Sequence, residues 1–164
     1  MAPFFGSFLV AVRAYAYIRA LGGEGLKAAS GMAVLNANYV LRRLRDVFPA
    51  AYDGWCMHEC LLTAAPLTAR NGIRALDIAK ALLDRGFHAP TVYFPLTVKE
   101  DLMIEPTETE SRETLDAFCD ALLEVARIAE EDPDQLHHAP TRLPVGRLDE
   151  VKAAKELNCA DLHH

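Results

Sequence analysis

The sequence lacks any run of roughly 18 uncharged apolar residues, the length that a membrane-spanning helix needs. Its longest apolar stretch, residues 4–18, is interrupted by Arg13. The first residues, Met1 to Phe5, lack the basic segment that opens a secretory signal. These absences argue against a membrane or secreted protein, and we expect a soluble, cytoplasmic one.

A concentrated positive charge is also missing. The 164 residues carry 17 Lys and Arg against 23 Asp and Glu, a net charge of −6. The basic residues Arg42, Arg43 and Arg45 cluster at the end of a predicted helix, where cations complement the helix dipole. Nucleic-acid binding needs a broader basic face, so the sequence does not predict a nucleic-acid partner.

Cysteine is scarce, with four residues in the chain, and we expect all four (Cys56, Cys60, Cys119 and Cys159) to be reduced thiols. A predicted strand over 57–63 would place Cys56, His58 and Cys60 on one face, with neighbours roughly 6.5–7 Å apart. Such a flat row suits tetrahedral zinc poorly, and it separates Cys56 from Cys60 too far for a disulfide. We therefore predict no metal, and a metal-binding module on these three residues is the least favoured of three functional hypotheses.

Common catalytic signatures are absent as well. The chain contains no P-loop, no GxGxxG, no GxSxG and no HExxH motif. Gly22-Gly23-Glu24-Gly25 has no preceding strand, so it fits a turn between two helices better than a phosphate-binding loop. No self-sufficient active site is visible.

The hydrophobic periodicity predicts an α+β fold, with a small antiparallel sheet and helices on one face. Helices are expected at 7–21, 26–48, 73–85 and 110–131, strands at 57–63, 91–94 and 102–105, and a loop at 66–72. The helix at 73–85 should stop at Gly86. We divide the chain into N-terminal helices (1–50), an α+β domain (51–131) and a C-terminal arm (132–164).

The acidic run Glu105-Pro106-Thr107-Glu108-Thr109-Glu110 has two interpretations. Thr107 followed by Glu110 forms a capping box, and acidic residues suit the first turn of a helix. Capping leaves Glu105 unexplained, at a strand end. His88 lies in a loop, where it is either a site residue or a histidine bonded to the backbone. His137-His138 and His163-His164 fall in the arm.

Several long strings in the chain carry a family resemblance. They are Phe4-Phe5-Gly6, VRAYAYIRALGGEGL (12–26), VLNANYVLRRL (34–44), LDIAKALLDRGFHAPTVYFPL (76–96), LMIEPTETES (102–111) and RLDEVKAAK (147–155). Together they resemble the C-terminal region of the glycine dehydrogenase (decarboxylating) family, the P proteins of the glycine cleavage system, and most closely subunit 2 of the two-subunit form. Only residues 156–164 depart from that pattern.

The resemblance implies an oxidoreductase of glycine catabolism that depends on pyridoxal phosphate. P proteins resemble fold-type-I enzymes, in which a large domain carries the cofactor-binding lysine and a C-terminal small domain closes over the site. They decarboxylate glycine and pass the aminomethyl group to the lipoyl H protein. The partners implied are the large domain, subunit 1 and the H protein.

The lysines of this chain depart from the family pattern. The family keeps its Schiff-base lysine in a His-Lys pair, whereas none of Lys27, Lys80, Lys99, Lys152 and Lys155 follows a histidine. We therefore expect pyridoxal phosphate in the full enzyme, none covalently bound to this fragment, and no activity from the fragment alone. The apolar helix 7–21 would pack on the large domain. The alternative is a non-enzymatic interaction domain that forms a homodimer through that helix.

Six residues in the matched segments lie at predicted strand ends and loops, where sites gather. The catalytic candidates are His58, His88, Thr91 and Glu105. The cofactor-binding candidates are Thr107 and Glu108. The resemblance assigns no individual role to any of them.

Overall fold

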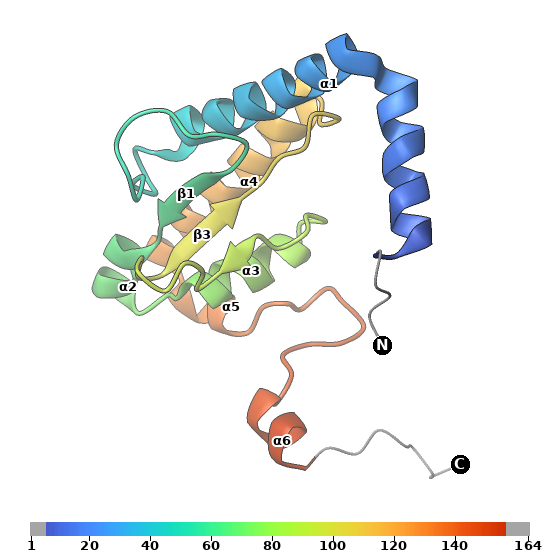
Figure 1. Cartoon of the computed structure of the whole chain (residues 1–164). Helices are drawn as coiled ribbons and strands as arrows, with labels where there is room; N and C mark the ends of the chain where they lie inside the picture. Colours follow the sequence, from blue (N-terminus) through green and yellow to red (C-terminus); the bar gives the residue numbers. More distant parts are fainter. Residues whose placement is uncertain (1–5, 157–164) are drawn as a thin grey trace.

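The computed structural model describes residues 6–156 (Figure 1). Its elements are α1 (Phe8–Leu44), β1 (Cys60–Thr63), α2 (Ala65–Asn71), α3 (Ala75–Leu83), β2 (Thr91–Val92), β3 (Asp101–Ile104), α4 (Arg112–Glu131), α5 (Pro133–His137) and α6 (Glu150–Lys155). The α+β prediction is confirmed. Expectations for Cys159 and for His163-His164 fall outside the described residues. None of the helices between residues 6 and 156 is long and apolar enough to cross a membrane.

The predicted small antiparallel sheet is confirmed, with three strands in the order β1-β3-β2. Cys60 pairs with Ile104 and Leu62 with Leu102, and all four side chains are buried. Successive residues of a strand point to opposite faces, so these four form one apolar face. In Figure 1 the long helix α4 lies behind that sheet, and α1 runs along one end of it.

The predicted amphipathic pattern of α4 is also confirmed. Leu115, Leu122, Val125 and Ile128 recur at helical spacing and are at most 8% exposed. They belong to the single hydrophobic cluster that joins the sheet to α1 and α3. Burial of this apolar stripe, rather than helix propensity, explains why the helix is stable.

Helix α1 is bent at Gly22, whose backbone is not helical (φ 63°, ψ −175°). Figure 1 shows the two parts at a steep angle, and we call residues 8–21 the N-terminal segment and residues 23–44 the C-terminal segment. The predicted break over residues 22–25 is therefore confined to one residue. Gly25 is also required, because a Cβ there would lie 2.9 Å from the Cβ of Leu21.

The loop predicted over 66–72 is wrong, because α2 occupies this region. Pro66 lies in the first turn, where its missing N–H costs nothing, and Gly72 ends the helix with a left-handed backbone (φ 79°). Thr63 also supports the start, because its Oγ1 accepts a hydrogen bond of 3.1 Å from the N–H of Ala65. Proline at a helix start and glycine at its end mimic the composition of a loop.

The strand predicted over 57–63 is shorter in the structure, where β1 begins only at Cys60. The backbone of Cys56 is held instead by the Asn38 side chain of α1, through hydrogen bonds of 2.7 and 3.1 Å. This contact holds the backbone at residue 56 against α1. Cys56 and His58 therefore do not share a strand face with Cys60, and that part of the sequence interpretation is wrong.

The helix cap predicted at Thr107 is also wrong. Ser111 caps α4, and its Oγ accepts a hydrogen bond of 3.2 Å from the N–H of Thr114. The loop carrying Thr107 is instead bonded to α1, so the helix begins later than the sequence suggested.

Replacing Ser111 with alanine is expected to lower the free energy of unfolding by about 1 kcal/mol, because the Thr114 N–H loses its partner. Thr107→Ala should change it by less than about 0.5 kcal/mol, since the Thr107 side chain is exposed. Urea unfolding of both variants measures the difference. A larger loss for Thr107→Ala would contradict the cap assignment.

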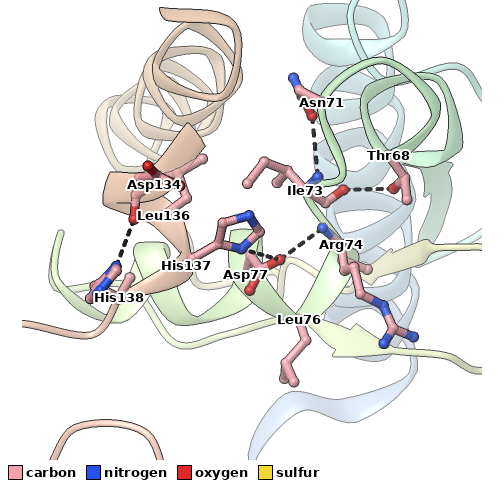
Figure 2. A network of polar contacts seen from close by, with 12 residues as sticks. Thr68, Asn71, Ile73, Arg74, Leu76, Asp77, Asp134, Leu136, His137 and His138 are labelled. Carbon is pink, nitrogen blue, oxygen red and sulfur yellow. Dashed lines mark hydrogen bonds and ion pairs between the residues drawn. The ribbon is translucent and has the colours of Figure 1, made fainter. Parts of the chain in front are cut away.

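The C-terminal arm is fastened to α3 through the buried carboxylate of Asp77. Its Oδ2 accepts a hydrogen bond of 2.9 Å from the N–H of Arg74 and lies 3.5 Å from Nδ1 of His137, as Figure 2 shows. Its Oδ1 accepts from Nη2 of Arg147 at 2.5 Å, and Arg147 also donates to the carbonyl of Ala139. Residues 132–140 thus pack on α3, and the Arg147 side chain reaches back to the same place.

A second fastening joins the arm to the end of α3 at Asp84. Its carboxylate accepts hydrogen bonds from the N–H groups of Thr141 (2.7 Å) and Arg142 (2.8 Å). Desolvation raises the pKa of the Asp84 carboxyl, but the hydrogen bonds from Arg142 and Thr141 outweigh it, so the pKa lies below its ordinary value.

The low pKa of Asp84 predicts a loss of stability in acid. Because the folded pKa is below the unfolded one, the contribution is complete above the unfolded value and disappears as the pH falls below about 4. The thermal midpoint of the wild type should exceed that of Asp84→Asn at pH 7, and the gap should shrink at pH 3. An equal gap at both pH values would contradict this prediction.

Candidate functional site

A hollow of about 380 Å³ opens at the end of the sheet where β3 finishes and β2 begins. The loop after α3, the two strands and the first turns of α4 all contribute to its walls. Its apolar side is built on Phe87 and Phe118, whose rings meet edge to face with centroids 5.5 Å apart. The geometry is typical of small sites, with apolar walls and a few polar groups at the rim.

Three of the predicted site residues line this hollow. His88 and Thr91 come from the loop after α3 and the start of β2, and Glu105 follows the last residue of β3. Because β2 and β3 are antiparallel neighbours, the start of one strand meets the end of the other. The topology thus brings together residues that lie up to 17 positions apart in the sequence. Their chemical roles stay predictions.

His58 lies beside the same group of residues, just before β1. Its Nε2 is 3.8 Å from Oε1 of Glu105 and 4.0 Å from Oε2 of Glu59. The His58 side chain is 56% exposed, so its imidazole and the Glu105 carboxylate face solvent together. Across residues 6–156, no three His, Cys, Asp or Glu side chains are close enough together to hold a metal ion.

Thr107 and Glu108 lie next to the hollow but do not line it. The carbonyl of Thr107 accepts a hydrogen bond of 2.8 Å from Nδ2 of Asn36, and Oε1 of Glu108 accepts one of 3.2 Å from the hydroxyl of Tyr17. Desolvation and the adjacent Glu108 carboxylate raise the pKa of the Tyr17 hydroxyl. Both segments of α1 thus contact the loop over 105–108.

A profile of the family described as glycine dehydrogenase, C-terminal domain, matches residues 29–143. The chain belongs to this family. The match takes in every strand and the whole lining of the hollow.

Curated relatives in the glycine dehydrogenase family are similar along nearly the whole chain. "Probable glycine dehydrogenase (decarboxylating) subunit 2" of Bacillus velezensis is 54% identical over 94% of this chain, and that of Exiguobacterium sibiricum is 55% identical over 94%. The Chlorobaculum tepidum protein of the same name is 52% identical over 99%. The chain spans about a third of the length of these relatives: 31%, 31% and 34%.

Pyridoxal phosphate, the cofactor that the family resemblance implies, requires an amine for its covalent attachment. The described residues that line the hollow include no lysine. The histidine, threonine and glutamate side chains that line it supply hydrogen bonds and negative charge, but not that amine. The residues present at this site therefore do not by themselves fit the cofactor.

Sequence reasoning missed two further residues of this glycine dehydrogenase domain, Asn36 and Asn38. Both are buried within α1, at 6% and 9% exposure, and both bond to loops that carry predicted site residues. The sequence contains a signal for them, because asparagine is a poor helix former and both residues lie within an apolar helical stretch. Only the fold shows which loops they reach.

An ionic contact between α1 and α4 holds the wall of the hollow in place. Arg43 bonds to Asp116 and, at 2.8 Å, to Oδ1 of Asp120, and the hydroxyl of Tyr39 also donates to Asp116. The Tyr39 hydrogen bond is the leading cause of the low pKa of the Asp116 carboxyl, with Arg43 adding to it. The start of α4 is thereby tied to α1.

Proposed function

We propose that this chain is the C-terminal small domain of subunit 2 of a two-subunit glycine dehydrogenase (decarboxylating). The observation that carries the proposal is the identity of 52–55% along nearly all of the chain to proteins of that name. The whole enzyme would decarboxylate glycine and pass the aminomethyl group to the lipoyl H protein. This chain would supply one wall of the active-site cleft.

The side chains that line the hollow indicate which roles this chain and the rest of subunit 2 would have. The rest of subunit 2 would hold pyridoxal phosphate, which serves as the electron sink for loss of the glycine carboxylate. His58, His88, Thr91 and Glu105 would face that cleft as hydrogen-bonding and charged groups. Thr107 and Glu108 would contribute to cofactor binding from the adjoining loop.

The N-terminal segment of α1 would pack on the large domain. Its apolar side chains are unusually exposed for a folded protein, with Phe8 at 78%, Leu9 at 72% and Tyr15 at 67%. Such a surface marks an interaction site. In this proposal residues 1–50 connect to the large domain, residues 51–131 form the small domain, and residues 132–164 form an arm along it.

A chimera tests the proposed function. The matching third of the Bacillus velezensis subunit 2 would be replaced by this chain and combined with subunit 1, lipoyl H protein and pyridoxal phosphate. We expect exchange of carbon between glycine and bicarbonate, and none from the 164-residue chain alone. A chimera that folds and binds its partners but shows no exchange would count against the proposal.

The same exposed segment supports a second candidate, a domain that forms a homodimer without catalysis. Light scattering of the isolated chain separates the two, since a dimer that persists on dilution favours the second for this polypeptide. Leu9→Asp would then abolish the dimer, because a charge would lie in its apolar contact. A monomer at all concentrations removes this candidate.

We also propose the partners and the cellular location of the protein. The relatives are named as subunit 2, and subunit 1 and the lipoyl H protein would be the partners of the assembled enzyme. A cytoplasmic location agrees with thiols at Cys56, Cys60 and Cys119, which are unpaired in the structure. Burial raises the pKa of all three, which suits inert structural cysteines.

A further inference from the structure

Two buried asparagines of α1 hold the two loops that carry most of the candidate site. Asn36 donates through Nδ2 to the carbonyl of Thr107 at 2.8 Å, across 71 positions of sequence. Asn38 accepts from the N–H of Cys56 at 3.1 Å and donates to the carbonyl of the same residue at 2.7 Å. The first contact fixes the loop that follows β3, and the second fixes the loop that precedes β1.

Asn38 binds both backbone polar groups of Cys56, and we call this pair of hydrogen bonds the Cys56 clamp. One amide side chain satisfies both the donor and the acceptor of a single peptide residue, as a neighbouring strand would. Its Nδ2 also bonds to the carbonyl of Val34 within α1, which locks the side chain in place. Burial makes these bonds costly to lose, since a buried polar group without a partner is strongly destabilising.

The two loops held in this way carry His58 and Glu105, whose side chains lie close together beside the hollow. His58 lies two residues beyond the Cys56 clamp, and Glu105 lies two residues before the Thr107 contact. The pairing of Cys60 with Ile104 brings the two loops side by side, and the asparagine contacts fasten each loop just beyond the paired residues, where the His58 and Glu105 side chains lie 3.8 Å apart. The remaining candidates, His88 and Thr91, are positioned by α3 and the sheet instead.

We propose that Asn36 and Asn38 are positioning residues of the active site, which hold the loops that carry His58 and Glu105 against a common helix. This inference rests on the proposed function for its catalytic part. Neither asparagine lines the hollow, so neither is expected to touch substrate. They act through the loops that they hold.

The test uses the chimeric subunit 2 with Asn36→Ala and Asn38→Ala, and Asn71→Ala serves as the matched control. Asn71 is also partly buried and donates to a distant backbone carbonyl, that of Ala129 at 2.7 Å, but it belongs to α2 and does not line the hollow. We expect the first two variants to lower kcat about 10- to 100-fold, the range that misplacement of catalytic groups produces. The Asn71→Ala control should keep kcat within about twofold of that of the unmodified chimera. Its loss of thermal stability should be comparable to that of the other two variants.

Hydrogen exchange gives a second measurement that does not need activity. Asn38→Ala should speed exchange in residues 54–59, and Asn36→Ala should speed it in residues 105–110, whereas Asn71→Ala should leave both loops unchanged. Where an alanine variant does not fold, Asn36→Asp and Asn38→Asp replace it, because each keeps the side-chain shape and removes the Nδ2 donor.

The outcomes separate this inference from the proposed function. Variants that keep kcat at the level of Asn71→Ala would overturn the positioning role, even if their stability falls. If the unmodified chimera shows no exchange of carbon between glycine and bicarbonate, the proposed function fails. Hydrogen exchange at the two loops then tests the positioning role by itself. Unchanged hydrogen exchange at both loops would then overturn the inference, and faster exchange confined to them would support it.

Discussion

Replacing Phe48 with alanine is expected to lower the free energy of unfolding by about 3–5 kcal/mol, the largest single effect on stability that the structure predicts. Phe48 is fully buried in the hydrophobic cluster, just beyond α1. Its N–H donates to the carbonyl of Leu44 at 2.9 Å, so the ring is held at the end of the helix. Truncation would leave a cavity where α1 meets the rest of the core.

The matched aromatic control for Phe48 is Trp55, which is 90% exposed in the loop before β1. Trp55→Ala should change the free energy of unfolding by less than about 0.5 kcal/mol. Urea unfolding, fitted with one common m-value, compares the stabilities of the two variants. Phe48→Leu supplies a milder variant if Phe48→Ala does not fold. Equal losses for Phe48→Ala and Trp55→Ala would contradict the assigned core.

Replacing Gly22 with alanine is expected to straighten α1. The backbone at Gly22 lies in a region that is almost exclusive to glycine, and another residue there would cost about 1–3 kcal/mol. A Cβ at Gly22 would meet nothing within 4 Å, so the cost comes from the backbone alone. A regular helix avoids that cost, at the expense of the hydrogen bond between Tyr17 and Glu108.

Small-angle scattering at concentrations where the chain is monomeric would detect this change as a larger radius of gyration for Gly22→Ala. Gly31→Ala is the control, since Gly31 is helical and a Cβ there would also meet open space. That variant should gain about 0.5–1 kcal/mol of stability with no change of shape. An unchanged radius for Gly22→Ala would contradict a bend that depends on glycine.

The sequence predicted the elements whose signals are local and unambiguous. The apolar repeat from Leu115 to Ile128 and the stop at Gly86 were sufficient for α4 and for the end of α3. Errors arose where one signal has two meanings. Pro66 and Gly72 mark a loop or the two ends of a short helix, and only the packing of Leu67 into the core selects the helix.

The candidate site was predictable to the extent that sites gather at strand ends. That rule selected His88, Thr91 and Glu105, and the antiparallel pairing of β2 and β3 brings them together. The capping-box pattern, in contrast, misplaced the cap at Thr107, because the competing contact from Asn36 comes from 71 positions away. Contacts of such sequence separation depend on the tertiary fold, and no local pattern contains them.

The central strand of the sheet is the last of the three in the chain. Within residues 6–156, β2 pairs with β3, whereas β1 pairs with β3 and, through a single bridge between Leu62 and Ala50, with the segment that precedes it. The three-stranded sheet can therefore form only once residues 101–104 lie between the other two strands. Pairing between strands so far apart in the sequence is slow, and the strands expose unpaired edges until it is complete.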